Sequence, residues 1–361
     1  MKASFTSGSL RHVLSVALIP VLSCLCVGAD APTAQPAATS ASRVAPPEPK
    51  PLVDGAKVVT LWPAGSPALK ALEGADKPEE IVLNKSGRVQ SVKNVHNPSI
   101  ELHLAPADKA NGCAIVVAPG GGNTQLVVGG EGIDTAEWLN SLGVHAFIER
   151  YRLRPYSSDG DALADTERSI RMVRAHAKEW GVDPKKVGIM GFSAGGEQAA
   201  WATLKYDNGD PNSADPVERE SSRPDFVVLV YPGWRRMDVS NVPKDAPPAF
   251  LVSAGADDAF HARQTVEFHN ALFEARVKAL AEEAKSRGNR AGAPSGDAAG
   301  KPDLTYQSPS ELHIYAHGGH GGDIKPRKGI PFGTWPTRFV EWANDLGIFK
   351  ANGDTPAAAA K

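Results

Sequence analysis

The chain has 361 residues, and its 39 lysines and arginines nearly balance its 41 aspartates and glutamates, which gives a formal net charge of −2 at pH 7. Charges of both signs are mixed along the chain. It therefore lacks the long-range positive field that binds polyanions, and we do not expect nucleic acid or an anionic membrane surface as a partner. The length suits one large domain, because α/β proteins often hold 250 or more residues in a single unit.

The N-terminal segment has the pattern of a secretory signal. Basic residues precede an apolar run over 13–27, which ends in the small-residue sequence Val-Gly-Ala. We expect residues 1–29 to be a signal peptide and the protein to be exported, to the periplasm or the extracellular space. The apolar run is short and interrupted by Pro20, so it does not favour a stable membrane span.

Cysteine usage predicts a mature protein without an internal disulfide. Cys24 and Cys26 fall inside the signal, which leaves Cys113 alone. Residues 21–24 weakly resemble a lipoprotein cleavage box, so a lipid anchor through Cys24 is an alternative to free export. Cys113 lies in an apolar run and is expected to be a small buried hydrophobe.

Composition divides the rest of the chain. Residues 30–56 are rich in proline and alanine and read as a linker, and 57–350 as one folded domain. Within that domain, 283–309 is a low-complexity stretch that we interpret as a surface insertion, which loop-closure entropy tolerates. Residues 351–361 are expected to form a disordered tail.

Apolar strand-like runs alternate with helical patterns through the domain. Such alternation predicts a mostly parallel central sheet with helices on both faces, and continuous apolar runs are typical of strands buried on both faces. The predicted strands are 114–118, 144–148, 187–190, 226–231, 249–252 and 312–316.

The helices are predicted from apolar residues that recur at helical spacing. One helix ends at Gly181, another covers 197–204, and the last begins near Pro336 and ends at Gly347, with Trp335 and Trp342 as packing residues. The residues that mark the helical faces are Ile170, Val173, Ala177 and Trp180, then Phe273, Val277 and Leu280, and finally Phe339, Ala343 and Leu346.

The segment Gly-Phe-Ser-Ala-Gly-Gly at 191–196 lies between a predicted strand and a predicted helix. A serine in Gly-x-Ser-x-Gly in this context sits on a sharp turn with its hydroxyl exposed, the arrangement known as a nucleophile elbow. Ser193 is therefore the candidate nucleophile.

A second glycine-rich loop, Pro-Gly-Gly-Gly-Asn at 119–123, follows the strand over 114–118. Acyl transfer needs N–H donors for a developing oxyanion, and glycines let the backbone approach the substrate oxygen. We assign the N–H groups of Gly121, Gly122 and Ala194 to an oxyanion hole. A plain tight turn is the alternative for this loop.

The remaining groups of a catalytic triad follow later strands. After 249–252 come Asp257 and Asp258, of which Asp257 is the first choice for the acid by its distance from the strand, and Asp258 is the alternative. The non-catalytic alternative is that both aspartates cap the helix that follows. After 312–316 comes His-Gly-Gly-His-Gly-Gly, in which His320 is the expected base and His317 its competitor.

The order Ser, Asp, His along the chain is that of α/β-hydrolases. The other histidines, His261 among them, are expected to have surface or packing roles. His317 and His320 lie three residues apart in a glycine-rich loop, and we see no third ligand for them, so no metal site is expected.

With these residues in place, the chain resembles the secreted α/β-hydrolase esterases of the acetylxylan esterase and bacterial feruloyl esterase type. The likeness covers about residues 95–350 and includes the motifs already described. Further shared segments are 131–132 with 138–144, 151–153, 174–181, 223–226, 231–233 and 334–336.

The resemblance implies an α/β-hydrolase fold and a serine carboxylesterase that needs no cofactor. Its substrates would be short acyl or hydroxycinnamoyl esters, on plant polysaccharides or acylated sugars. Three features depart from the pattern: Glu197 stands where related enzymes often have histidine, Ser253-Ala254 replaces the usual His-Gly or His-Ala, and 283–309 is inserted.

Two other functions are weighed against this one. A prolyl-oligopeptidase-like exopeptidase shares the triad order but normally carries a large additional domain, and a non-catalytic carbohydrate-binding protein on the same scaffold would not need an intact triad. Arg152, Arg154, Tyr156 and Trp234 could line the pocket, although packing or surface pairing is the simpler interpretation for each.

Overall fold

The computed structural model describes residues 47–69, 77–256, 258–288 and 310–350. The described part of the chain is built around an eight-stranded sheet with the order β1-β4-β6-β5-β7-β8-β9-β10. The pairs β1/β4 and β4/β6 are antiparallel, and each later pair is parallel. The sheet is therefore mostly parallel, as predicted.

Each of the six predicted strands coincides with a strand of this sheet, within one or two residues at the ends. The strands are β1 Lys57–Thr60, β4 Ser99–His103, β5 Ala114–Ala118, β6 His145–Arg150, β7 Val187–Phe192, β8 Val227–Val230, β9 Ala249–Ala254 and β10 Glu311–Tyr315. The antiparallel strands β2 Glu80–Leu83 and β3 Val89–Lys93 form a separate pair.

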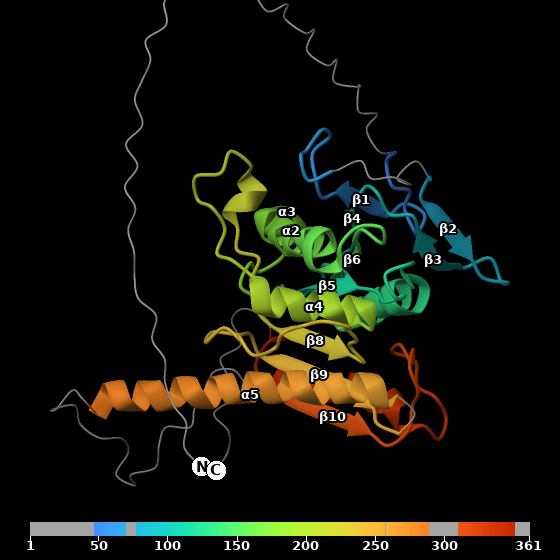
Figure 1. Ribbon diagram of the computed structural model, residues 1–361. Helices are drawn as coiled ribbons and strands as arrows, with labels where there is room; N and C mark the ends of the chain where they lie inside the picture. The colour runs from blue at the N-terminus through green and yellow to red at the C-terminus, as the bar shows by residue number, and fades with distance from the viewer. Residues whose placement is uncertain (1–46, 70–76, 257, 289–309, 351–361) are drawn as a thin grey trace, which may run out of the picture. The chain divides into compact units, whose positions relative to one another are not determined.

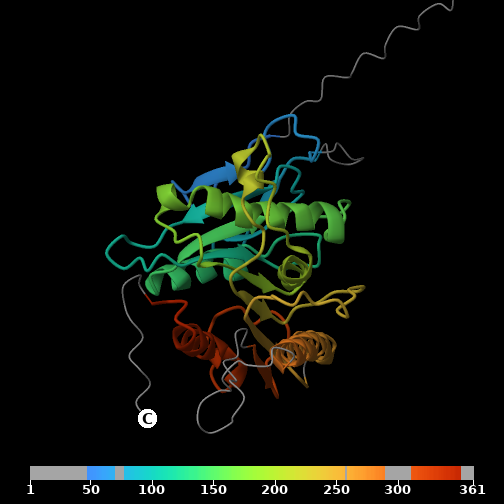
Figure 2. The same ribbon diagram turned by 90° about the vertical axis from the view of Figure 1, so that its left-hand side faces the viewer.

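Helices cover both faces of the sheet (Figures 1 and 2). Residues of α1 and α6 belong to one buried apolar cluster, whereas residues of α2, α4 and α5 belong to the other. The helices are α1 Thr135–Ser141, α2 Leu163–Ala175, α3 Ala177–Trp180, α4 Ala194–Lys205, α5 Ala259–Gly288 and α6 Trp335–Asp345. Shorter helical turns are η1 Gly129–Asp134, η2 Ser158–Ala162, η3 Pro216–Arg219 and η4 Pro331–Thr334.

The central strands contribute to both clusters because successive side chains of a strand point to opposite faces. In β5, Ile115 and Val117 pack with α1 and α6, whereas Ala114 and Val116 pack on the opposite side. Every residue of β5 is buried. Burial on both faces explains why this strand is a continuous apolar run in the sequence.

The helix expected from Phe273, Val277 and Leu280 is α5. Phe273 and Val277 are 45% and 43% exposed, whereas Phe268 and Leu272 of the same helix are buried in the core. The helix before the elbow is divided at His176 into α2 and α3. Trp335 and Trp342 are buried, in line with their predicted packing role.

The predicted signal peptide (1–29), most of the predicted linker and insertion, and the predicted tail (351–361) lie outside the described residues. None of the helices in the described part of the chain is long and apolar enough to cross a membrane.

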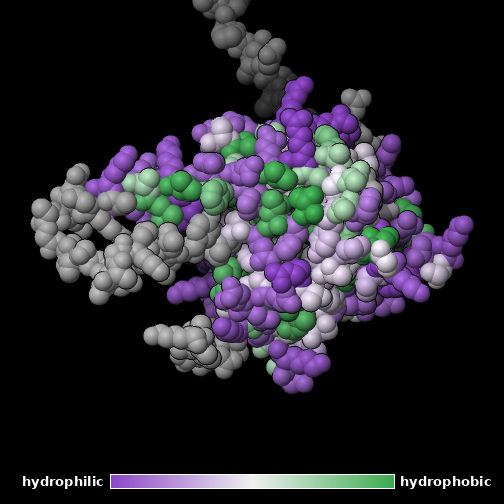
Figure 3. All heavy atoms as spheres, turned by 90° about the horizontal axis from the view of Figure 1, so that it is seen from below, coloured by the Kyte–Doolittle hydropathy of each residue, from purple (hydrophilic) through white to green (hydrophobic). Residues whose placement is uncertain are grey.

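Cys113 is fully buried, and burial raises the pKa of its thiol, so it is an unreactive core residue. Figure 3 shows apolar side chains in small groups among polar ones on the face that it views.

Phe339 on α6 offers a direct test of this core. Its ring is fully buried, with its centroid 5.7 Å from that of Phe250 and 6.0 Å from that of Trp138. Phe339→Ala should lower the free energy of unfolding by about 3–5 kcal/mol, because it removes buried apolar area and leaves a cavity. Phe273→Ala on the exposed side of α5 is the control and should change it by no more than about 0.5 kcal/mol. Urea titration measures both, and equal effects would contradict the assignment of the core.

Candidate active site

Ser193 lies in the one-residue turn between β7 and α4. Its backbone has φ 50° and ψ −115°, a left-handed conformation that non-glycine residues rarely adopt. The turn is held on both sides: the Ser193 N–H donates to the carbonyl of Val230 (3.0 Å), and the Ser193 carbonyl accepts from the Gly233 N–H (3.1 Å). The hydroxyl is therefore fixed at the carboxyl edge of the sheet, where ligands bind in open α/β folds.

The glycines around Ser193 are required by the space available. A Cβ atom on Gly195 would lie 1.9 Å from the carbonyl oxygen of Ala118, and one on Gly191 would lie 2.2 Å from that of Gly195. Both distances are too short for any side chain. The motif therefore allows β5, β7 and the start of α4 to approach one another closely.

His320 and Asp258 complete a hydrogen-bonded chain with Ser193. His320 Nε2 lies 2.8 Å from Ser193 Oγ, and His320 Nδ1 lies 2.9 Å from Asp258 Oδ2. His320 comes from the loop after β10, and Asp258 comes immediately before α5. Three segments distant in the sequence thus meet at one edge of the sheet, and the nucleophile, acid and base come after β7, β9 and β10, in line with the strands that they were predicted to follow. The histidine in this position is His320, the expected base, and not its competitor His317.

The carboxylate beside His320 is that of Asp258, the alternative, and not that of the first choice, Asp257. Asp257 itself lies outside the described residues. An imidazole Nδ1 carries at most one hydrogen, and Asp258 accepts from it, so Asp258 replaces Asp257 as the candidate acid. Asp258 stands next to the first residue of α5, and it is 9% exposed.

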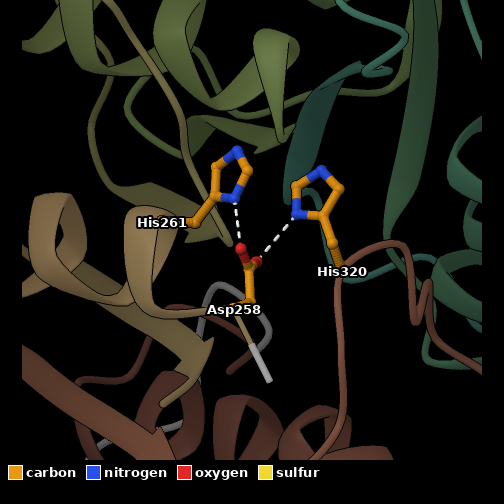
Figure 4. Close-up of side chains that lie close together, drawn as sticks. All are labelled: Asp258, His261 and His320. Atoms are coloured by element: carbon orange, nitrogen blue, oxygen red, sulfur yellow. Dashed lines mark hydrogen bonds and ion pairs between the residues drawn. The ribbon is translucent and has the colours of Figure 1, made fainter. Parts of the chain in front are cut away.

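A second imidazole contacts the same carboxylate (Figure 4). His261 Nδ1 lies 2.5 Å from Asp258 Oδ1, and the ring of His261 stacks on that of His320 with 3.9 Å between centroids and 19° between planes. A surface or packing role was expected for His261 from the sequence, and its contact with the candidate acid was not foreseen. His261 follows Asp258 by three residues, and α5 begins between them, so the two side chains lie on one face at the start of that helix.

The surroundings of His320 favour its neutral form. Burial lowers the pKa of His320, and the neighbouring His261 lowers it further, whereas the hydrogen bond to Asp258 acts in the opposite direction. Tyr231 packs edge-on against the ring, with 4.8 Å between centroids. An imidazole that is neutral near pH 7 can accept a proton from the serine hydroxyl.

The glycine-rich loop after β5 lies against Ser193. A Cβ on Gly120 would lie 2.8 Å from that of Ser193, and Gly121, Gly122 and Asn123 have positive φ values of 131°, 65° and 59°. The Gly120 N–H donates to Oε2 of the buried Glu131 (2.6 Å). This contact anchors the start of the loop, and the assignment of Gly121, Gly122 and Ala194 as oxyanion donors stays a prediction.

Glu131 joins this loop to two others. Its Oε1 accepts from the hydroxyl of Tyr231 (3.0 Å), and that hydroxyl accepts from the Asp323 N–H (3.1 Å). Burial raises the pKa of Glu131 to about 7. The loops after β5, β8 and β10 are therefore connected through a single buried network.

A cavity of about 590 Å³ opens beside Ser193. Glu197, one of the departures from the family pattern, lines this cavity, is 9% exposed and accepts from Asn123 Nδ2 (3.2 Å). The four residues proposed from sequence as possible pocket residues all line it: Arg152, Arg154, Tyr156 and Trp234. Arg152 also forms a buried ion pair with Asp165 (2.8 Å), so packing and lining roles coexist in that residue.

Among the described residues, Asp258, His261 and His320 also form a group close enough to hold a metal ion, since their ligand atoms all lie within 4.8 Å of one another. Both carboxylate oxygens of Asp258 already accept hydrogen bonds from the imidazoles. The arrangement as it stands is that of a hydrogen-bonded relay.

Comparison with known proteins agrees with this architecture. Residues 135–288 match the model of a family with the α/β-hydrolase fold. A solved structure, an acetyl ester-xyloside bifunctional hydrolase from Caldicellulosiruptor lactoaceticus, is similar with a TM-score of 0.59 and 26% identity, over 81% of this chain and 97% of that one. The protein therefore has the α/β-hydrolase fold.

Two curated relatives are similar over a shorter stretch. An acetylxylan esterase from Xylanibacter ruminicola is 38% identical over 125 residues, which are 35% of this chain and 23% of that protein. Endo-1,4-beta-xylanase B from Butyrivibrio fibrisolvens is 31% identical over 138 residues, 37% of this chain and 21% of the relative. The match thus spans about a fifth to a quarter of these relatives. It confirms the resemblance to acetylxylan esterases that the motifs indicated.

The stacked imidazoles predict a measurable effect on His320. Its ring should titrate below pH 6.5, and His261→Phe should raise its pKa, because the substitution removes the neighbouring imidazole that lowers this pKa and leaves Asp258 to His320 alone. NMR titration of the imidazole signals measures both values. His269→Phe, also on α5, is the control and should leave the midpoint unchanged. An unchanged or lower midpoint in His261→Phe would contradict the electrostatic coupling.

Proposed function

We propose that the protein is a serine carboxylesterase that hydrolyses short acyl or hydroxycinnamoyl esters on plant polysaccharides or related acylated sugars. The observation that carries this proposal is the hydrogen-bonded chain from Ser193 through His320 to Asp258. The similarity to an acetylxylan esterase and to an acetyl ester-xyloside hydrolase supports the substrate class. Export is part of the proposal and rests on the sequence pattern of residues 1–29.

The reaction begins at Ser193. His320 Nε2 takes the proton of the hydroxyl as Oγ attacks the ester carbonyl, which forms a tetrahedral intermediate with a negative oxygen. His320 then gives that proton to the leaving alcohol as the C–O bond breaks, and an acyl-enzyme remains. Water, activated by the same imidazole, attacks the acyl-enzyme and releases the acid.

Asp258 acts on the orientation and charge of the base. By accepting from Nδ1–H, it selects the tautomer in which Nε2 faces Ser193, and its negative charge stabilises the imidazolium that forms during attack. It is nearly buried, so this charge is poorly screened by solvent. The carboxylate does not need to accept a full proton.

The backbone N–H groups of Gly121, Gly122 and Ala194 are proposed to bind the negative oxygen. Gly122 and Ala194 line the same cavity as Ser193, and Ala194 is the first residue of α4, so its N–H has no partner four residues earlier in the helix. The positive end of the α4 dipole adds to the stabilisation. The proposed chemistry uses side chains and backbone amides, and it requires no cofactor.

The identity of the acid gives a sharp test, because two adjacent aspartates are available for comparison. Ser193→Ala should reduce kcat for 4-nitrophenyl acetate by about 10⁴-fold or more. Asp258→Asn should reduce it by about 10³–10⁴-fold, because the base loses its orienting partner. Asp257→Asn is the matched control and should retain activity within about 3-fold.

Two outcomes of this assay would overturn the proposal. Full activity in Ser193→Ala would show that Ser193 is not the nucleophile. A larger loss of activity in Asp257→Asn than in Asp258→Asn would show that Asp257 is the acid of the triad. A preference for aminoacyl-4-nitroanilides over esters would instead favour an exopeptidase. Glycan binding without any ester hydrolysis would favour a binding protein on this scaffold.

A further inference from the structure

The cavity beside Ser193 carries more positive charge than a neutral ester requires. Two loops contribute arginines to its lining: one carries Arg152 and Arg154 after β6, and the other carries Arg235 and Arg236 after β8. These loops come from opposite sides of β5 and β7 in the strand order. Guanidinium groups therefore reach the cavity from both sides of the nucleophile.

Backbone contacts fix both loops close to the reacting groups. The Arg154 N–H donates to the carbonyl of Asn123 (3.0 Å), the residue after the proposed oxyanion glycines. On the other side, the Gly233 N–H donates to the Ser193 carbonyl (3.1 Å), two residues before Arg235. The Trp234 N–H donates to Gln264 Oε1 (2.9 Å), which holds this second loop on α5.

The arginines differ in whether their charge is already neutralised. Arg152 is buried and paired with Asp165, so its charge is compensated within the protein. Arg154, Arg235 and Arg236 are exposed, and none of them forms an ion pair with another residue in the described ranges. Three guanidinium groups thus remain available to a ligand.

Acidic residues of the lining do not cancel this charge. They are Asp159 and Glu197. Glu197 is nearly buried and hydrogen-bonded to Asn123, and burial raises its pKa. The remaining lining includes the aromatic side chains of Tyr156, Trp234 and Phe260, of which Phe260 is 58% exposed. The cavity therefore combines an apolar surface with an excess of unpaired guanidinium groups.

We propose that the preferred substrate is an acylated saccharide that carries a carboxylate, such as a uronic acid residue near the ester. This inference rests on the proposed esterase function and names its substrate class more closely. Arginine presents a planar fork of N–H donors that matches a carboxylate in two parallel hydrogen bonds. Arg154, Arg235 and Arg236 would bind the carboxylate at the mouth of the cavity while the acyl group enters toward Ser193.

A matched pair of substrates tests the proposal. 3-Acetoxybenzoate and 3-acetoxybenzamide have nearly the same shape, and they differ in the charge next to the ester. With each rate divided by the rate of alkaline hydrolysis, kcat/KM should be about 10-fold higher for the anionic ester, since bonds between charged partners are the stronger ones. The preference should shrink as salt is raised to about 0.5 M, because exposed charges are screened. Acetylated xylo-oligosaccharides with and without a glucuronic acid branch should show the same order.

Variants of Arg235 and Arg236 test whether these side chains cause the preference for the anionic ester. In Arg235→Ala/Arg236→Ala the ratio of the two kcat/KM values should fall to about 1–3, and in Arg235→Glu/Arg236→Glu it should fall below 1. Arg338→Ala on α6 is the control: this exposed arginine pairs with Glu311 and lies outside the cavity lining, so the ratio should stay as in wild type. Because both substrates are measured on one preparation, loss of folded protein cancels in the ratio.

The possible outcomes distinguish failure of the anionic-substrate proposal from failure of the esterase proposal. Hydrolysis of both esters at equal corrected rates would overturn the anionic substrate and leave the esterase function standing. A preference that persists unchanged in Arg235→Glu/Arg236→Glu would also overturn it. If the protein hydrolyses neither of these two esters and does not hydrolyse 4-nitrophenyl acetate, both the esterase function and this inference are contradicted.

Discussion

The site depends on the close approach between the carboxyl end of β5 and the start of α4. The Cα of Gly195 is so near the carbonyl of Ala118 that a single methyl group would collide with it. This approach forces the chain to turn within one residue, and Ser193 occupies that turn with a left-handed backbone. A conformation of this kind costs of the order of 1–3 kcal/mol and persists only where surrounding contacts determine it. Here the hydrogen bonds to Val230 and Gly233 supply those contacts.

Tyr231 connects the other parts of the site to this turn. It follows β8 with a positive φ of 38°, its hydroxyl joins Glu131 to the Asp323 N–H, and its ring lies against His320. Glu131 in turn holds Gly120. One buried side chain thus ties the loop of the base to the loop proposed to bind the oxyanion. Buried networks of this kind fix the geometry of a site when each member has a partner.

The sequence predicted those parts of the structure in which a local pattern has a single physical cause. Strands buried on both faces must be apolar throughout, so β5 was visible as a run of five apolar residues. Antiparallel strands near the sheet edge, such as β1 and β4, have mixed polarity and were not predicted. The glycine spacing identified the turn at Ser193 because it stood between a predicted strand and a predicted helix, the context that a nucleophile elbow requires.

The directions in which side chains point after the chain leaves a strand were harder to predict from the sequence. Whether Asp257 or Asp258 faces the imidazole depends on how the chain leaves β9 and enters α5, and a shift of one residue changes the direction of the side chain. His261 was assigned a surface or packing role because no motif includes it. Its contact with Asp258 follows from the helix that begins between them, and this becomes clear only when the start of α5 is known.

The most direct test of the central claim is covalent trapping of the nucleophile with a fluorophosphonate probe, followed by mass spectrometry of the digested protein. The account predicts one adduct per chain, on the peptide that contains Ser193, with labelling that slows as pH falls through the pKa of His320. Labelling of a different residue, or equal labelling of Ser193→Ala, would contradict it.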